Sequence, residues 1–203
     1  KVPPAGSQRK AQWNFVKEIV ENTRYVRTNQ AIFLSILGLV YFAFLGGLFQ
    51  PNILLYARNL MGVDHLLASL LLVSISLGIG FGGLMAGKFS DQKIELGLVP
   101  LGALGISVFS MQLGFNYHSY GSVLWSLFFL GISSGFYIVP LNTVIQFESP
   151  KDQRGRIIAT NNFYSFSAIL LASVAIYFLG DVFHVNAAKT FIVIGLATIL
   201  GAF

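Results

Sequence analysis

Apolar residues in this chain gather in long runs that carry no charge and are separated by short polar segments. Five runs lack Lys, Arg, Asp and Glu, and they cover residues 30–49, 66–87, 96–116, 121–147 and 157–180. A helix of about 20 apolar residues crosses the hydrocarbon core of a bilayer. A sixth run, Thr190–Phe203, is apolar but shorter. The runs do not alternate in polarity as the strands of a membrane barrel do.

The pattern therefore predicts an all-α, polytopic membrane protein with six helices, the last of them truncated. With their flanks, the expected spans of the transmembrane domain 30–203 are about 30–58, 64–87, 96–116, 119–147, 157–180 and 187–203.

Residues 1–29 differ from the spans because apolar and charged positions are mixed. Within 11–27, apolar side chains recur at helical spacing, and Lys17, Glu18, Glu21 and Arg24 lie between them. This spacing is typical of an amphipathic helix on a membrane surface. A simple tether that leads into the first span is a compatible alternative. We expect 1–29 to be a linker that contains such a helix.

Two prolines fall inside predicted helices. Pro51 removes a backbone donor and frees the carbonyl of Gly47, and Pro140 does the same to Phe136. If the first helix continues to residue 61, it is about 48 Å long, which exceeds the bilayer core. We expect a kink or an extension outside the membrane there. Such breaks persist where protein or a water-filled cavity satisfies the freed groups.

Charge adds an orientation to this topology. The chain has 13 Lys and Arg, and eleven of them fall in the segments 1–29, 88–95 and 149–156, while the intervening turns hold only Arg58 and Lys189. Cytoplasmic loops of membrane proteins carry such an excess of basic residues. The three segments are therefore expected in the cytoplasm, and the net charge of +5 is attributed to them and not to nucleic-acid binding.

Cysteine is absent, which excludes disulfides. The chain begins without Met and ends inside an apolar run, so we expect it to be a piece of a longer protein.

A glycine-rich segment, G-I-G-F-G-G at 78–83, fits the dinucleotide-binding pattern G-x-G-x-x-G. That pattern needs a preceding strand and a helix that starts at the phosphate, whereas this segment lies inside an apolar span. The pairs Gly78/Gly82 and Gly83/Gly87 are instead typical of close helix packing in membranes.

Two of the basic loops contain both signs of charge next to tight turns. The first has G-L-M-A-G-K-F-S-D-Q-K-I-E at 83–95 and the second has E-S-P-K-D-Q-R-G-R at 148–156. Opposite charges of the two loops could pair in one conformation and bias a switch, although exposed pairs contribute only about 0–1 kcal/mol each. The alternative is anchoring by positive charge alone. The candidate gating residues are Gly83, Gly87, Lys88, Asp91, Lys93, Glu95, Glu148, Arg154 and Arg156.

These turns resemble those of the major facilitator superfamily. The match consists of six helices, G-x-x-x-G-K after the second and E-S-P-x-x-x-R-G-R after the fourth. The segments at 91–105, 139–142 and 154–162 are similar to the lysophospholipid transporter family. In one departure, Gly87 stands where the superfamily usually places an acid, and the nearest acid is Asp91.

This resemblance implies the C-terminal six-helix half of a transporter in the bacterial inner membrane. It also implies an N-terminal half as partner, and a fused acyltransferase and synthetase in some members.

Polar residues inside spans are costly and usually face the protein interior. The substrate-binding candidates are Gln50, Asn52, Arg58, Tyr137, Asn142, Gln146, Asn161, Asn162 and Ser165. For each amide the alternative is a hydrogen bond between helices. Arg58 could attract a phosphate or anchor its helix at the interface. Tyr41 and Trp125 could also line the path of an amphiphile.

Three function classes follow from these features. A lysophospholipid transporter with alternating access comes first, because the motifs resemble that family. The absence of an acid or base deep in any span fits such an amphiphilic substrate, which needs few polar contacts. A transporter of another solute or drug, and the membrane domain of a fused enzyme, are the alternatives. His65, His118 and His184 are scattered in outer turns, so we expect no catalysis, no metal site and no cofactor in this chain.

Overall fold

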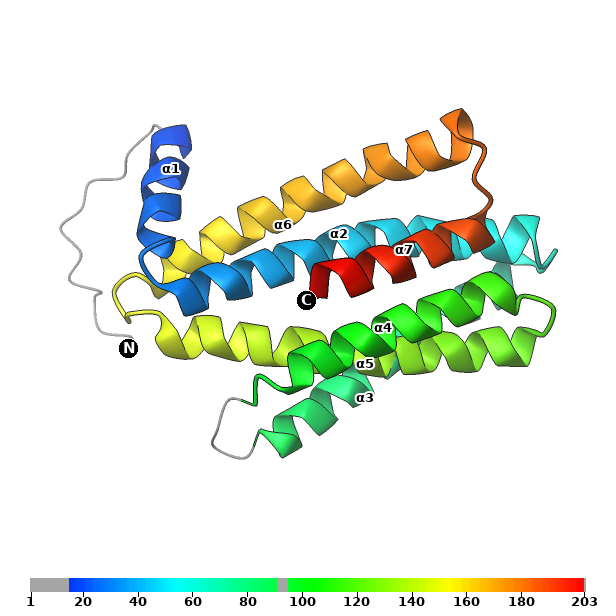
Figure 1. Cartoon of the computed structure of the whole chain (residues 1–203), viewed down its shortest axis with the longest axis horizontal. Coiled ribbons are helices and arrows are strands. Elements are labelled where there is room, and N and C mark those ends of the chain that lie inside the picture. Colours follow the sequence, from blue (N-terminus) through cyan, green and yellow to red (C-terminus); the bar gives the residue numbers. More distant parts are fainter. Residues whose placement is uncertain (1–14, 91–94, 203) are drawn as a thin grey trace.

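A computed structural model describes residues 15–90 and 95–202, and these residues form helices joined by short turns (Figure 1). The elements are α1 (Phe15–Val26), α2 (Gln30–Asn59), α3 (His65–Phe89), α4 (Leu98–Phe115), α5 (Tyr120–Glu148), α6 (Arg154–Tyr177), the π-helical η1 (Phe178–Val182) and α7 (Ala187–Ala202). The described ranges contain no strand. The all-α prediction is confirmed, and α2 to α6 are long and apolar enough to cross a membrane, whereas α7 is shorter.

Several helix starts are fixed by side chains that accept hydrogen bonds from free N–H groups. The Asn29 side chain accepts from Ala31 and Ile32 at the start of α2, and Asp64 accepts from Leu67 at the start of α3. Such caps satisfy donors that have no partner within the helix. α2 remains helical through Pro51 and ends at Asn59. Gly62, with a φ of +65°, follows in the turn, where a left-handed conformation favours glycine.

The six long helices lie side by side along the length of the bundle, and α1 crosses one end of it (Figure 1). α3 contacts α5, α5 contacts α2, and α2 contacts α6, so these four form one row. α4 and α7 pack against each other, with α4 on α5 and α7 on α2. We call the end with α1, the start of α4 and the start of α6 the basic end.

The row of helices is held closely by glycines. A methyl group on Gly78 would lie 2.9 Å from Gly131 Cα, and one on Gly82 would lie 2.7 Å from Ile132 Cα. Carbon atoms prefer separations of about 3.5–4.0 Å. The packing role predicted for Gly78 and Gly82 is confirmed. The prediction is wrong for Gly87, because a methyl group at this position would meet nothing within 4 Å.

Hydrogen bonds between helices join α4 and α7 to the row formed by α3, α5, α2 and α6. The Tyr56 hydroxyl donates to the Leu113 carbonyl across 2.8 Å, which ties α2 to α4. The Tyr41 hydroxyl donates to Thr198 across 3.0 Å, which ties α2 to α7. In hydrocarbon, where water cannot serve as a partner, polar side chains commonly join helices in this way.

Candidate functional site

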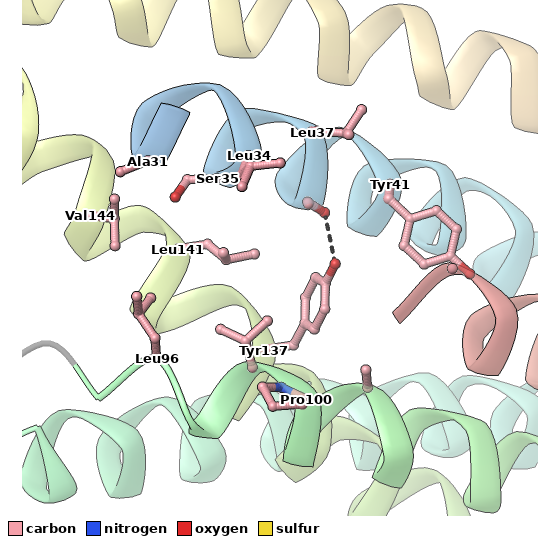
Figure 2. A pocket seen from close by; sticks show the side chains of 14 residues that line it. Ala31, Leu34, Ser35, Leu37, Tyr41, Leu96, Pro100, Tyr137, Leu141 and Val144 are labelled. Atoms are coloured by element: carbon pink, nitrogen blue, oxygen red, sulfur yellow. Dashed lines mark hydrogen bonds between the residues drawn. The ribbon is translucent and has the colours of Figure 1, made fainter. Parts of the chain in front are cut away.

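A cavity of about 690 Å³ lies near the basic end between α2, α4, α5 and the last turn of α7, and we call it the apolar cavity (Figure 2). Most of its wall is hydrocarbon. The apolar lining comes from Ala31, Leu34, Leu37, Leu96, Val99, Pro100, Ala103, Leu141 and Val144. Pockets of this kind suit ligands with large apolar parts, and a few polar groups then set orientation.

Three hydroxyl-bearing residues also line this cavity: Ser35, Tyr41 and Tyr137. Tyr137 points from α5 toward α2, and its hydroxyl donates to the Gly38 carbonyl across a long 3.4 Å (Figure 2). Tyr41 is turned toward α7, where Thr198 Oγ1 accepts a hydrogen bond from its hydroxyl. Tyr41 and Tyr137, singled out from sequence, thus line the same cavity. Trp125, the third aromatic of that prediction, does not; it packs beside Phe128 instead.

The predicted amides of α5 lie outside this cavity. Asn142 is partly buried, and its Nδ2 donates to the Ile138 carbonyl of the same helix across 3.0 Å. Gln146, one turn further on, is exposed. The two residues are four apart and share a side of α5. Leu141 and Val144 occupy the cavity side at the same level.

Asn161 on α6 carries an unusual polar atom. Its Oδ1 is buried and accepts no hydrogen bond from a described residue. Leaving a buried acceptor unsatisfied costs about 1–3 kcal/mol. Ser165, one turn on, is partly buried, whereas Asn162 is exposed. Of the three polar candidates on α6, Asn161 therefore has the strongest need for a ligand, a water or a partner helix.

The candidates on α2 separate into two groups. Gln50 is exposed on the same side as Gly46 and Leu54, which are exposed as well. Asn52 is only 1% exposed, and its Nδ2 donates to the Ala187 carbonyl at the start of α7 across 3.0 Å. This is the helix–helix bond that was the alternative for each amide. Arg58 is exposed in the last turn.

The candidate gating residues gather at the basic end. Lys88 and Glu95 are exposed near the ends of α3 and α4, and Glu148 is exposed at the end of α5. Arg154 and Arg156 are partly buried in the first turn of α6. Asp91 and Lys93 lie outside the described residues. Glu95 and Arg154 form no ion pair with each other in this structure, so the latch stays a prediction.

The structure does not collect the predicted binding residues into one pocket. Of those residues, Tyr137 lines the apolar cavity, and Asn52 borders a second cavity of about 460 Å³ at the opposite end of the bundle. Within 15–90 and 95–202, no cluster of three His, Asp or Glu side chains could hold a metal ion.

The cavity wall from α4 was missed by the sequence analysis. Val99, Pro100 and Ala103 are ordinary apolar residues, and no polar or charged signal marks them. The second cavity was missed too. It lies beside η1, and the pattern of apolar residues did not predict the wider π turn of that segment.

Comparison with known proteins agrees with the architecture. The sequence profile of the Major Facilitator Superfamily matches residues 1–173. The lysophospholipid transporter LplT of Yersinia enterocolitica is 31% identical over 113 residues, which is 53% of this chain and 26% of that protein. The match thus spans about a quarter of the length of that curated relative. No solved structure gives a significant match. With its membrane-crossing helices and this match, the chain belongs to the Major Facilitator Superfamily.

Proposed function

We propose that this chain is one six-helix half of an alternating-access transporter that moves lysophospholipid across the bacterial inner membrane. The observation that carries the proposal is the similarity to a lysophospholipid transporter over 113 residues. In transporters of this kind, two halves rock around a site near the middle of the membrane. The partner would be an N-terminal half of similar size, and the basic end would face the cytoplasm.

The chemistry of the interior supports an amphiphilic substrate. The apolar cavity is lined mostly by hydrocarbon with a few neutral hydroxyls, which suits an acyl chain. The polar candidates of α5 and α6, Asn142 and Asn161, are neutral amides that could bind a phosphate or a glycerol hydroxyl. No charged residue lies between 98 and 147 or between 157 and 180, so this half offers no site for a strongly charged small solute.

The test is transport by the full-length protein in liposomes. Labelled lysophosphatidylethanolamine placed in one leaflet should appear in the other at a rate that depends on the protein. Transport of a sugar or a drug without movement of the lysolipid would refute the proposed substrate and favour the second class, a transporter of another solute. A lysolipid with its acyl chain shortened should compete less well.

A matched pair of variants tests the role of the apolar cavity. Leu37 lines it and is 55% exposed, whereas Leu77 on α3 is 62% exposed and does not line it. Leu37→Trp should obstruct the cavity and slow lysolipid transport several-fold, and Leu77→Trp should leave the rate unchanged. Equal rates in the two variants would remove the cavity from the transport path.

We further propose that the two charged turns act as a latch. Glu95 lies in the connection that leads into α4, and Arg154 begins α6 at the same end of the bundle. The Nε of Arg154 is buried and donates to no described residue, so its surroundings are incomplete in this conformation. A carboxylate that reaches it in another conformation would stabilise that conformation.

A further inference from the structure

The second cavity lies at the end of the bundle away from α1, where α2 and η1 end and α7 begins (Figure 1). α6 has 24 residues and is therefore about 36 Å long, whereas the hydrocarbon core of a bilayer is about 30 Å thick. Because η1 continues from α6, a bilayer around the bundle would place this cavity at the level of the lipid headgroups. Tyr177, Phe178 and Phe183 are exposed there, and aromatic residues are enriched at such interfaces.

Backbone oxygens at the end of η1 have no partner in the described ranges. The carbonyls of Gly180, Asp181 and Val182 accept no hydrogen bond from a residue of 15–90 or 95–202. Free carbonyls at the end of a helix form the negative end of its dipole, which favours cations. Gly180 and Asp181 line the second cavity, so this negative end lies at the cavity wall.

The Asp181 side chain adds a full negative charge at the same place. Its carboxylate forms no ion pair or hydrogen bond with any described residue. Asn59 and Asn186 line the same cavity and are exposed, so their amides are also available. Among the described residues, no Lys or Arg lines it; Arg58 and Lys189 are exposed and are not part of its wall. The cavity is therefore suited to a positively charged group.

The lining favours a primary ammonium group over a metal ion. The volume of about 460 Å³ is far more than one ion fills, and Asp181 is its one carboxylate, whereas Ca²⁺ takes roughly six to eight oxygen ligands. A primary ammonium group donates three hydrogen bonds, which the carboxylate, the free carbonyls and the Asn59 amide oxygen can accept. A trimethylated ammonium group has no N–H donor and is recognised by several aromatic rings, but Tyr177 is the one aromatic residue in this lining.

We propose that the second cavity binds the primary ammonium group of a phospholipid headgroup, with Asp181 as its counter-ion. Two lipids could supply this group, a diacyl phospholipid of the surrounding bilayer or a lysophospholipid. Leu55, Ile176 and Val185 give the cavity an apolar part that suits the carbon atoms next to the nitrogen. A bound headgroup would join the end of α2 to η1 and to the start of α7. This proposal does not depend on which substrate is transported.

Native mass spectrometry of the full-length transporter tests this site. The protein in detergent is titrated with phosphatidylethanolamine and with phosphatidylcholine of the same acyl chains, which differ only in methylation of the nitrogen. Phosphatidylethanolamine should bind about tenfold more tightly, which is the effect of removing one hydrogen bond to a charged group.

The corresponding pair of lysolipids separates the two sources. A similar preference in the diacyl and the lyso pair shows that the headgroup alone is recognised, so the abundant bilayer lipid occupies the cavity. A preference confined to the lyso pair identifies a lysophospholipid as the occupant.

Asp181→Asn keeps the size of the side chain and removes its charge, so the preference for the primary ammonium group should disappear. The carboxylate is exposed and has no contact partner among the described residues, so the change should leave folding intact. Asp152→Asn is the matched control, because it makes the same chemical change at an exposed residue of the basic end. This control should retain the preference.

Three results would overturn the proposal. The first is equal affinity of the unmodified protein for the two headgroups in both pairs of lipids. The second is an undiminished preference in Asp181→Asn. The third is a loss in Asp152→Asn as complete as in Asp181→Asn, which would assign the preference to the net charge of the protein and not to this cavity.

Discussion

The contact between α3 and α5 depends on the absence of side chains at a few positions. We predict that Gly82→Ala destabilises the protein, whereas Gly80→Ala, two residues away on the same helix, does not. A methyl group at Gly82 would lie 2.7 Å from Ile132 Cα and 2.8 Å from its carbonyl carbon, and both of these are backbone atoms. A methyl group at Gly80 meets nothing within 4 Å.

The magnitude follows from two opposing terms. Replacing a glycine inside a helix by alanine stabilises the helix by about 1 kcal/mol in either variant. At Gly82 the new methyl group must also push α5 away, and overpacking of this kind costs about 1–3 kcal/mol. The helix term is common to both variants and cancels when they are compared. Gly82→Ala should therefore be less stable than Gly80→Ala by about 1–3 kcal/mol.

Reversible unfolding of the full-length transporter in mixed micelles measures this difference. Thermal melting should rank the stabilities of the variants in the same order. For a domain of 150–250 residues, 1 kcal/mol corresponds to about 2–4 °C in Tm. Gly78→Ala should behave like Gly82→Ala, because its methyl group would lie 2.9 Å from Gly131 Cα. Equal stability of the Gly80 and Gly82 variants would show that α3 and α5 do not approach as closely as described.

The remaining predictions concern polar residues. Asn161→Leu removes an unsatisfied buried acceptor, so the protein should become more stable by about 1–3 kcal/mol while lysolipid transport falls; an equal loss of transport in the control Asn162→Leu, at an exposed residue, would contradict a specific role. Asn52→Leu should lower the free energy of unfolding by about 0.6–1.7 kcal/mol with transport unchanged, and impaired transport at full stability would instead place Asn52 in the site. Glu95→Arg should shift the transporter toward the conformation open at the basic end, measured by cysteine labelling there, and Arg154→Glu in the same protein should restore the original labelling; an unchanged single variant would remove the latch.

The fold was largely predictable because its main signal is composition. Runs of about 20 apolar residues have few solutions in a bilayer, since the backbone must satisfy its own hydrogen bonds. The same logic identified the packing of Gly78 and Gly82. The prediction of packing failed at Gly87, because the spacing of glycines alone does not show where the contact between two helices ends. It also gave no indication of η1, because no residue type marks the wider π turn of Phe178–Val182.

The site was less predictable because polarity inside a span has two uses. Asn52 and Asn161 were equivalent candidates by sequence, yet Asn52 bonds to α7 and Asn161 has an unsatisfied oxygen. Only the positions of neighbouring helices separate these cases. The apolar cavity is lined mostly by leucine, valine, alanine and proline, which carry no functional signal. Its two tyrosines were recognisable as candidates, but not as residues that line the same cavity.

α6 is the helix whose surroundings are least complete among the described residues. Only 11% of the apolar window from α6 into η1 is buried, whereas 50% of that of α5 is buried. Buried polar atoms without a partner also occur on α6, at Arg154 Nε and Asn161 Oδ1. An apolar surface alone would be satisfied by lipid, but Asn161 Oδ1, which lies within the apolar run 157–180, would not, because hydrocarbon supplies no hydrogen bonds. α6 therefore needs polar groups from a substrate, from water or from the proposed N-terminal half. A span in that position can change partners as the transporter moves, whereas α3 and α5, locked together through glycines, are expected to move as one body.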